Sequence, residues 1–337
     1  MSTILSQAPL GFPWITLDPF LFCVHHLDAY PSGNPDMSVK ASLLGRNIGS
    51  DFSYKDGWSM YHGNSVPGFP RHPHRGFETI TIGRQGFIDH SDSMGATARF
   101  GAGDVQWMTA GKGVVHSEMF PMRNQNTPNP TELFQIWLNL PAKDKFVEPY
   151  FTMFWRNQID IVDYIDDVGL RSSIQVVAGN FQQSKGPTPP PNSWASHPLS
   201  DIAILTIQME ANADLWLEPA NKGTTRVLYF FRGKTLQINS SNCALSHAIQ
   251  VNPEHKLHLA NGDEPTEILL LQGRPIGEPV VKYGPFVMNS QQEIQQAYHD
   301  YQRTGFGGWP WKNDGPAHAS TQERFAIHAD GRREDAG

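Results

Sequence analysis

Two short motifs carry the clearest chemistry in this sequence. His72 and His74 lie two residues apart, and His116 and Glu118 repeat this spacing with a carboxylate in second place. In a β-strand, residues i and i+2 point to the same face and lie about 7 Å apart, so each motif can direct two side chains toward one point. If the two strands are neighbours, three neutral imidazoles and one carboxylate converge. This donor set suits a divalent metal ion with open coordination positions.

The same histidines also have a structural interpretation. An H-x-H pair alone is weak evidence in a chain with 14 histidines. In this alternative, His72 and His74 are exposed loop residues beside Pro73, and His116 is a buried histidine with ordinary hydrogen bonds. Glycines near both motifs, at positions 76, 86, 111 and 113, permit tight turns and favour the metal site.

Four further assignments concern the surroundings of the motifs. Glu78 follows His74 by four residues and shares its strand parity, so it is a rival ligand or an acceptor that orients an imidazole. Tyr61 and His62 are candidates for lining a pocket, with a structural role as the alternative for His62. Glu118 is the candidate catalytic base toward an enol or phenol hydroxyl, as well as a ligand.

Composition excludes several classes of protein. The 337 residues carry a net charge of -7, which argues against binding to a phosphate backbone as the main activity. Two cysteines are too few for a disulfide scaffold or a thiolate zinc site and fit a reducing compartment. No apolar run approaches the length of a membrane span, and no signal peptide is apparent. We therefore expect a cytoplasmic protein, or a nuclear one if the source is eukaryotic.

Strand patterns occur in both halves of the chain. Short runs of β-branched and alternating apolar residues, separated by turn signals, favour a barrel or sandwich in each half. Between residues 141 and 200 this pattern weakens, and residues 185–191 form a proline-rich loop. The predicted strands are 77–82, 105–108 and 133–140 in the first half, and 202–209, 227–231, 235–238, 247–251 and 266–271 in the second.

One helix is predicted near the C-terminus. Ser290 and Glu293 have the spacing of a capping box, and four apolar residues between positions 294 and 301 form one stripe. We expect a helix over residues 290–304 that packs on a barrel. Residues 311–337 show little periodicity and are expected to form a tail, partly disordered.

Three longer segments resemble the signature of the pirin family. They are residues 68–79 (GFPRHPHRGFET), 103–119 (GDVQWMTAGKGVVHSEM) and 277–289 (GEPVVKYGPFVMN). The resemblance implies an all-β bicupin, in which two antiparallel jelly-roll barrels lie face to face, with a short C-terminal α-helix. We therefore expect a metal-binding cupin domain over 1–145, a metal-free cupin domain with the helix over 146–310, and a tail over 311–337.

The resemblance also implies a ligand set and an ion. Pirins typically hold iron through the residues that match His72, His74, His116 and Glu118, and this match places Glu78 outside the direct ligands. Iron(II) is the expected ion, with nickel, manganese, copper and zinc as alternatives. Residues 36–66 look like extra sequence before the metal motif, which leaves the substrate open.

Two functions follow from the resemblance. The first is a metal-dependent dioxygenase of the quercetin 2,3-dioxygenase type, whose partners are O2 and a small aromatic or enol substrate. The alternative is a redox- or metal-sensing regulator that acts through a protein partner without turnover, as a transcriptional co-regulator or as a modulator of a metabolic enzyme. A non-redox zinc or nickel cupin is a third hypothesis. No direct binding to nucleic acid or membrane is expected.

Overall fold

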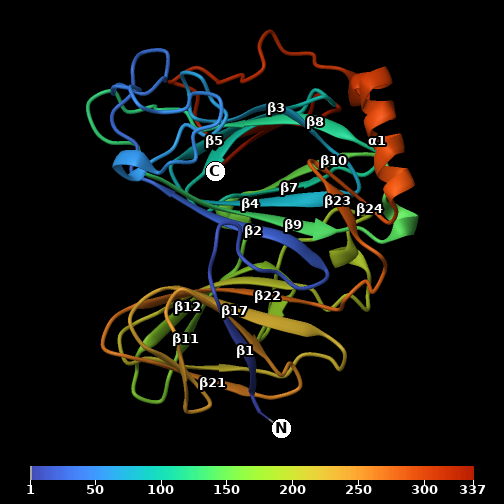
Figure 1. Ribbon diagram of the computed structural model, residues 1–337. Helices are drawn as coiled ribbons and strands as arrows, with labels where there is room; N and C mark the ends of the chain where they lie inside the picture. Colours follow the sequence, from blue (N-terminus) through green and yellow to red (C-terminus); the bar gives the residue numbers. More distant parts are fainter. Residues whose placement is uncertain (1) are drawn as a thin grey trace. The chain divides into compact units, whose positions relative to one another are not determined.

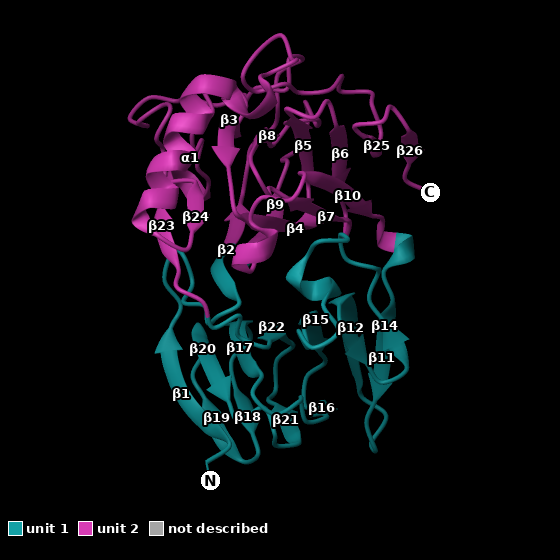
Figure 2. Ribbon diagram, turned by 90° about the vertical axis from the view of Figure 1, so that its right-hand side faces the viewer, with its two compact units in different colours: residues 1–24, 137–139, 157–277 teal, residues 25–136, 140–156, 278–337 magenta. Residues whose placement is uncertain are grey.

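The computed structural model describes residues 2–337 and consists mainly of β-strands (Figure 1). The chain divides into two compact units, shown in different colours in Figure 2. Unit 1 contains the chain up to Val24, residues 137–139 and residues 157–277. Unit 2 contains residues 25–136, 140–156 and 278–337. The expectation of an all-β protein with two β units and a C-terminal helix is confirmed.

Unit 2 is built on two antiparallel sheets. The strands β9 and β2 extend beyond this unit into ranges that belong to unit 1. The six-stranded sheet has the order β26 (Arg333–Asp335), β25 (Phe325–Ile327), β6 (Thr97–Gly101), β5 (Phe87–Asp92), β8 (Val114–Met119) and β3 (Gly68–His74). The five-stranded sheet has the order β10 (Tyr150–Phe154), β7 (Val105–Thr109), β4 (Phe77–Gln85), β9 (Thr131–Asn139) and β2 (Phe20–Asp28).

Unit 1 also contains two larger antiparallel sheets. The first has the order β1 (Ile4–Pro9), β20 (His247–Val251), β17 (Thr225–Arg232), β22 (Thr266–Gly273), β15 (Ala203–Met209), β12 (Arg171–Ala178) and β11 (Ile161–Ile165). The second has the order β16 (Asp214–Leu217), β21 (Leu257–Asn261), β18 (Leu236–Ile238) and β19 (Ser241–Cys243). A short hairpin is formed by β13 (Asn180–Phe181) and β14 (Ser184–Lys185).

Strand alternation explains how these sheets enclose a core. In unit 1, Leu228 and Phe230 on β17 belong to the same buried cluster as Ile268 and Leu270 on β22. Residues two apart on a strand face the same side, so one face of each strand points into the barrel. The predicted strand runs of both halves all fall within these strands or overlap them.

The C-terminal helix is confirmed as α1 (Gln291–Thr304). Its N-cap is Ser290, whose side-chain oxygen accepts a hydrogen bond from the Glu293 amide at 3.2 Å. Glu293 in turn accepts from the Asn289 amide at 2.9 Å, so orphan amides at the helix start are satisfied. The helix ends at Gly305, which adopts a left-handed conformation with φ 55°.

The units follow the chain differently from the predicted ranges 1–145, 146–310 and 311–337. Strand β1 pairs with β20 and so adds the N-terminal residues to unit 1. Residues 278–337 belong to unit 2, which contains the hairpin of β23 (Val281–Tyr283) and β24 (Phe286–Met288) and the helix α1 (Figure 2). Apolar side chains of the hairpin and the helix are buried there. Ile294 and Ala297 of α1 share a buried cluster with Val115 of β8.

The last segment of the chain has more structure than the expected tail. Strand β25 pairs antiparallel with β6, and β26 pairs with β25. A buried arginine holds the preceding loop. Arg99 forms an ion pair with Asp89 and donates hydrogen bonds to the carbonyls of His318, Ala319 and Gln322. This segment is therefore fixed to the six-stranded sheet by a charge that cannot reach water. No helix in the described part of the chain is both long and apolar enough to cross a membrane.

Replacing Arg99 by methionine tests this attachment. The change leaves the buried Asp89 carboxylate without its cation, so we expect the free energy of unfolding to fall by about 3–5 kcal/mol. Limited proteolysis should also cut within residues 316–324 faster than in the unmodified protein. Arg303→Met is the matched control, because the Arg303 side chain is exposed on α1. Urea denaturation should show a change within about 0.5 kcal/mol for the control, and equal effects of the two changes would contradict the account.

Candidate metal centre

The two histidine motifs lie on neighbouring antiparallel strands. Strand β3 pairs with β8 in a register that places His72 directly opposite His116, after a one-residue irregularity between Phe69 and His72. Strand β3 is at the edge of its sheet, which explains why prolines at positions 70 and 73 are tolerated within it. The strands that carry the two motifs are therefore neighbours, as the predicted metal site requires.

Three imidazole rings meet at this position. The centroids of His72 and His116 are 4.4 Å apart, and His74 lies 4.8 Å from each of them. One nitrogen from each ring forms a group whose members all lie within 4.8 Å of one another. His74 and His116 are buried and His72 is partly exposed, so the cluster has one side closer to solvent.

Backbone carbonyls orient two of the rings. Nδ1 of His72 lies 2.9 Å from the Pro70 carbonyl oxygen, and Nδ1 of His74 lies 3.4 Å from that of Pro285. A carbonyl oxygen only accepts, so each ring carries its hydrogen on Nδ1 and keeps the lone pair on Nε2. Metal-binding histidines are commonly oriented in this way. The Pro285 carbonyl comes from the turn between β23 and β24, a contribution from the C-terminal part of the chain.

The third ring is the one that an ordinary structural role does not explain. Both nitrogens of His116 are buried, and neither has a hydrogen-bond partner within residues 2–337. Leaving a buried polar group unpaired costs about 1–3 kcal/mol, and a bound metal ion would remove that cost for one nitrogen. The structural alternative placed His116 in ordinary hydrogen bonds and both other histidines in an exposed loop, and it is wrong on both points. The residues fit a divalent metal.

Glu118 extends the cluster from β8. Its Oε2 lies 4.0 Å from Nε2 of His116, which two ligands on opposite sides of one ion can reach, since each bond is about 2.0–2.2 Å. The Gln135 amide donates to Oε2 at 3.1 Å, and the Thr81 hydroxyl lies 3.0 Å from Oε1. Thr81 on β4 and Gln135 on β9 also contact each other. These two side chains of the opposite sheet hold the carboxylate in place.

Burial sets the protonation state of the cluster. It lowers the pKa of His72 to about 4 and, with the neighbouring rings, holds the pKa values of His74 and His116 well below their usual range. The three imidazoles are therefore neutral at pH 7, which is the form that binds a metal. Burial raises the pKa of Glu118, while His90, Thr81 and Gln135 act in the opposite direction.

Glu78 does not continue the strand of the H-x-H pair. Gly76, with φ 84°, separates β3 from β4, so strand parity does not carry over from His74 to Glu78. A β-carbon at Gly76 would lie 2.1 Å from the Val287 carbonyl oxygen, so this turn requires glycine. The Glu78 carboxylate accepts hydrogen bonds from Trp107 at 3.1 Å and Thr109 at 2.7 Å.

Tyr61 and His62 lie in an aromatic group on the chain segment before β3. The Tyr61 hydroxyl donates to Asp28 at 2.8 Å, and its oxygen lies 2.8 Å from Nδ1 of His26. The Tyr61 ring stacks on Phe69, and His62 contacts the same ring edge-on. Phe69 in turn contacts the metal cluster, because its ring centroid is 6.3 Å from that of His72.

Sequence reasoning missed several residues around the centre. His90 on β5 pairs directly across from Glu118, and its ring lies 5.5 Å from that of His116. Its Nε2 lies 3.2 Å from the Asp92 carboxylate, whereas its buried Nδ1 has no partner among the described residues. The signal that could have found it is the i, i+2 spacing of His90 and Asp92. Thr81, Gln135 and the Pro285 carbonyl carry no comparable signal.

Comparison with known families identifies the chain. Residues 37–138 match the pirin family, and residues 204–307 match the pirin C-terminal cupin domain. The chain belongs to the pirin family. It is a bicupin, as the sequence resemblance implied. The first match begins at residue 37, so it spans nearly all of the segment 36–66 that precedes the metal motif.

Relatives and solved structures agree with this assignment. This pirin-family chain is 37% identical over 241 residues to a Pseudomonas aeruginosa protein named "Putative quercetin 2,3-dioxygenase PA2418", covering 71% of this chain and 79% of the relative. It is 35% identical over 251 residues to a pirin-like protein of Solanum lycopersicum, covering 71% and 77%. The crystal structure of a quercetin 2,3-dioxygenase from Acinetobacter baumannii superposes with a TM-score of 0.71 at 26% identity, covering 91% of this chain and 99% of that one.

Replacing His74 by alanine should abolish metal binding while the protein stays folded. The change removes one of three converging imidazoles, whereas the cores of both units are unaffected. Elemental analysis after anaerobic purification with iron measures the loss, and circular dichroism checks the fold. His247→Ala, on β20 of unit 1, is the matched control and should keep the metal content of the unmodified protein. Retention of the ion by the His74 variant would contradict the proposed ligand set.

The pH dependence of the metal-free protein tests the buried state of His72. Its pKa is about 4 in the folded protein, below the ordinary value of about 6.5. Between these two pH values the unfolded chain binds a proton that the folded protein does not. The free energy of unfolding therefore rises with pH in this window, and the stability that His72 contributes is lost on acidification. In His72→Gln this contribution is absent. We expect the unfolding free energy of the unmodified protein minus that of the variant to fall from pH 7 to pH 4. A constant difference would contradict the lowered pKa.

Proposed function

We propose that this chain is a metal-dependent dioxygenase of the quercetin 2,3-dioxygenase type. The observation that carries the proposal is the buried cluster of His72, His74 and His116, in which both nitrogens of His116 lack a hydrogen-bond partner in the described chain. The similarity to relatives and to a solved structure with quercetin 2,3-dioxygenase names supports it. Iron(II) is the proposed ion, with nickel, manganese, copper and zinc as alternatives.

His72, His74, His116 and Glu118 would hold the ion. A bound redox-active ion would supply Lewis acidity toward a substrate oxygen and the activation of O2. The protein contributes the geometry of this centre. Carbonyl groups fix the ring orientation of His72 and His74, and burial keeps the imidazoles neutral. A site that holds its ligands in place before substrate binds needs little rearrangement during the reaction.

Glu118 is the proposed base. Gln135 and Thr81 fix its carboxylate, and burial raises its pKa, so it binds a proton more strongly than an exposed glutamate. A base of this kind can take the proton from an enol or phenol hydroxyl at Oε1 or Oε2. The proposed substrate is therefore a small aromatic or enol molecule with an acidic hydroxyl, used together with O2.

The proposed location is the cytoplasm. Cys23 and Cys243 are both buried and free, as expected in a reducing compartment.

The direct assay uses protein purified without oxygen and loaded with iron. Quercetin is added with O2, and oxygen consumption and loss of flavonol absorbance are followed together. We expect turnover that depends on both the metal and O2. Absence of oxygen-dependent turnover with iron, manganese, nickel and copper would reject the proposal and leave the regulatory and the non-redox cupin alternatives.

Replacing Glu118 by glutamine tests its role as a catalytic base separately from its role as a metal ligand. The amide keeps the size of the side chain but cannot accept the substrate proton, so we expect kcat to fall about 10²–10⁴-fold. The three histidines should retain the metal, which elemental analysis measures in the same preparation. Glu148→Gln is the matched control, because the Glu148 side chain is exposed and pairs with Lys112. A Glu118 variant with unchanged kcat would exclude the proposed role of this carboxylate.

A further inference from the structure

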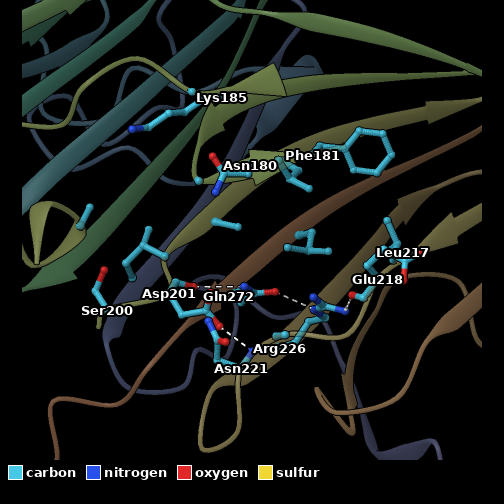
Figure 3. Close-up of a pocket in the computed structure, with 18 of the residues that line it drawn as sticks. Asn180, Phe181, Lys185, Ser200, Asp201, Leu217, Glu218, Asn221, Arg226 and Gln272 are labelled. Atoms are coloured by element: carbon cyan, nitrogen blue, oxygen red, sulfur yellow. Dashed lines mark hydrogen bonds between the residues drawn. The ribbon is translucent and has the colours of Figure 1, made fainter. Parts of the chain in front are cut away.

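Unit 1 contains a cavity that the metal chemistry does not use. It has a volume of about 780 Å³ and is lined entirely by residues between Tyr164 and Gln272 (Figure 3). This size lies within the range of about 300–1,000 Å³ that is typical of small-molecule sites. Its lining combines an apolar wall with a few polar groups. The apolar wall includes Phe181, Leu205, Leu217 and Leu270.

A buried arginine occupies an interior position in this cavity. Arg226 lies on β17, two residues before Leu228, so its side chain points to the face that forms the core of unit 1. It pairs across the sheet with Gln272, which is likewise two residues from the core residue Leu270. Arg226 is only 6% exposed. A charge at such a position is costly unless something compensates it.

The neighbours of Arg226 accept two hydrogen bonds from its guanidinium group but do not neutralise its charge. Its Nε donates to Gln272 Oε1 at 2.8 Å, and its Nη1 donates to the Glu218 backbone carbonyl at 2.9 Å (Figure 3). Both acceptors are neutral. Among residues 2–337, Arg226 has no carboxylate partner within ion-pair distance, and its Nη2 makes no hydrogen bond. Burial lowers the pKa of Arg226 to about 10, so the group remains charged at pH 7.

The other charged side chains of the lining leave a positive surplus. Glu218 pairs with Lys256 at 2.7 Å. The Asp201 carboxylate accepts hydrogen bonds from the Asn221 amide at 2.9 Å and from the Thr224 hydroxyl at 2.8 Å. Asp201 is the acidic group that acts on Arg226 from a distance. Lys185 adds a third cation to the lining, against two carboxylates. The cavity is thus positive within a protein of net charge -7.

We propose that this cavity binds a small organic carboxylate. The carboxylate of the ligand would accept hydrogen bonds from Nη2 of Arg226. The apolar body of the ligand would lie against Phe181, Leu205, Leu217 and Leu270. Arginine presents its N–H groups as a planar fork that suits a carboxylate, and a charge-assisted hydrogen bond is stronger in a buried position. The ligand supplies the negative charge that Arg226 lacks. None of the residues that line the cavity belongs to the histidine motifs.

Matched acids and amides test the proposal on the full chain. Benzoate, 4-hydroxybenzoate and trans-cinnamate are titrated into the metal-loaded protein beside their primary amides, and binding is followed by calorimetry and by NMR shifts of the cavity methyl groups. We expect at least one acid to bind at least tenfold more tightly than its amide. Inorganic phosphate, which has charge but no apolar body, should bind more weakly than that acid.

Variants at two arginines of β17 test whether the preference for acid over amide depends on Arg226. Arg226→Gln should abolish the preference for acid over amide, and Arg226→Lys should reduce it. Arg232→Gln is the matched control, because Arg232 pairs with Glu267 and does not line the cavity, so the preference should remain. Equal binding of acids and amides to the unmodified protein, tighter binding of phosphate, or an unchanged preference in Arg226→Lys would each overturn the proposal. The acid and amide comparison does not require any variant to fold, and it does not depend on oxygenase activity.

Discussion

Three imidazole rings packed within 4.8 Å of one another form the constraint on which the organisation of unit 2 depends. Such a cluster is unfavourable without an ion, because burial removes water from its nitrogens and the positions of the rings prevent them from becoming charged. Both nitrogens of His116 lack a hydrogen-bond partner in the described chain. A fold that keeps this arrangement must hold the rings by other means, and it does so through the pairing of β3 with β8 and the carbonyls that orient His72 and His74.

Much of that support comes from the C-terminal part of the chain. Residues 278–337 return to unit 2, where the turn after β23 supplies the Pro285 carbonyl that lies near His74. Helix α1 buries its apolar stripe near Val115, one residue before His116. The last strands are fixed to the sheet of β5 and β6 through Arg99. Segments that are far apart in sequence thus support β3, β8 and β6, which belong to one sheet.

The sequence predicted the parts of the site that depend on local periodicity. The i, i+2 spacing of His72 with His74 placed both rings on one face, and the capping box placed α1 within one residue of its observed start. The prediction for Glu78 assumed one continuous strand, whereas Gly76 turns the chain between β3 and β4. Parity arguments fail wherever such a turn intervenes.

The remainder of the site depends on contacts that periodicity does not encode. Gln135 reaches Glu118 from another sheet, and nothing in its own segment marks it. The N-terminal strand β1 belongs to unit 1 because it pairs with β20, and the C-terminal strand β25 belongs to unit 2 because it pairs with β6. These pairings join residues more than 200 positions apart, and short strands of this kind give weak signals in a sequence. In unit 1, Arg226 interrupts an otherwise apolar strand face, and only the structure shows that it faces a cavity.

The central claim is that His72, His74, His116 and Glu118 bind one metal ion. X-ray absorption spectroscopy of protein purified without oxygen, together with elemental analysis, tests it most directly. We expect one metal ion per chain, surrounded by three imidazole nitrogens and a carboxylate oxygen at about 2.0–2.2 Å. A metal-free protein that takes up no ion from excess iron, nickel, manganese, copper or zinc, or an ion without imidazole ligands, would contradict it.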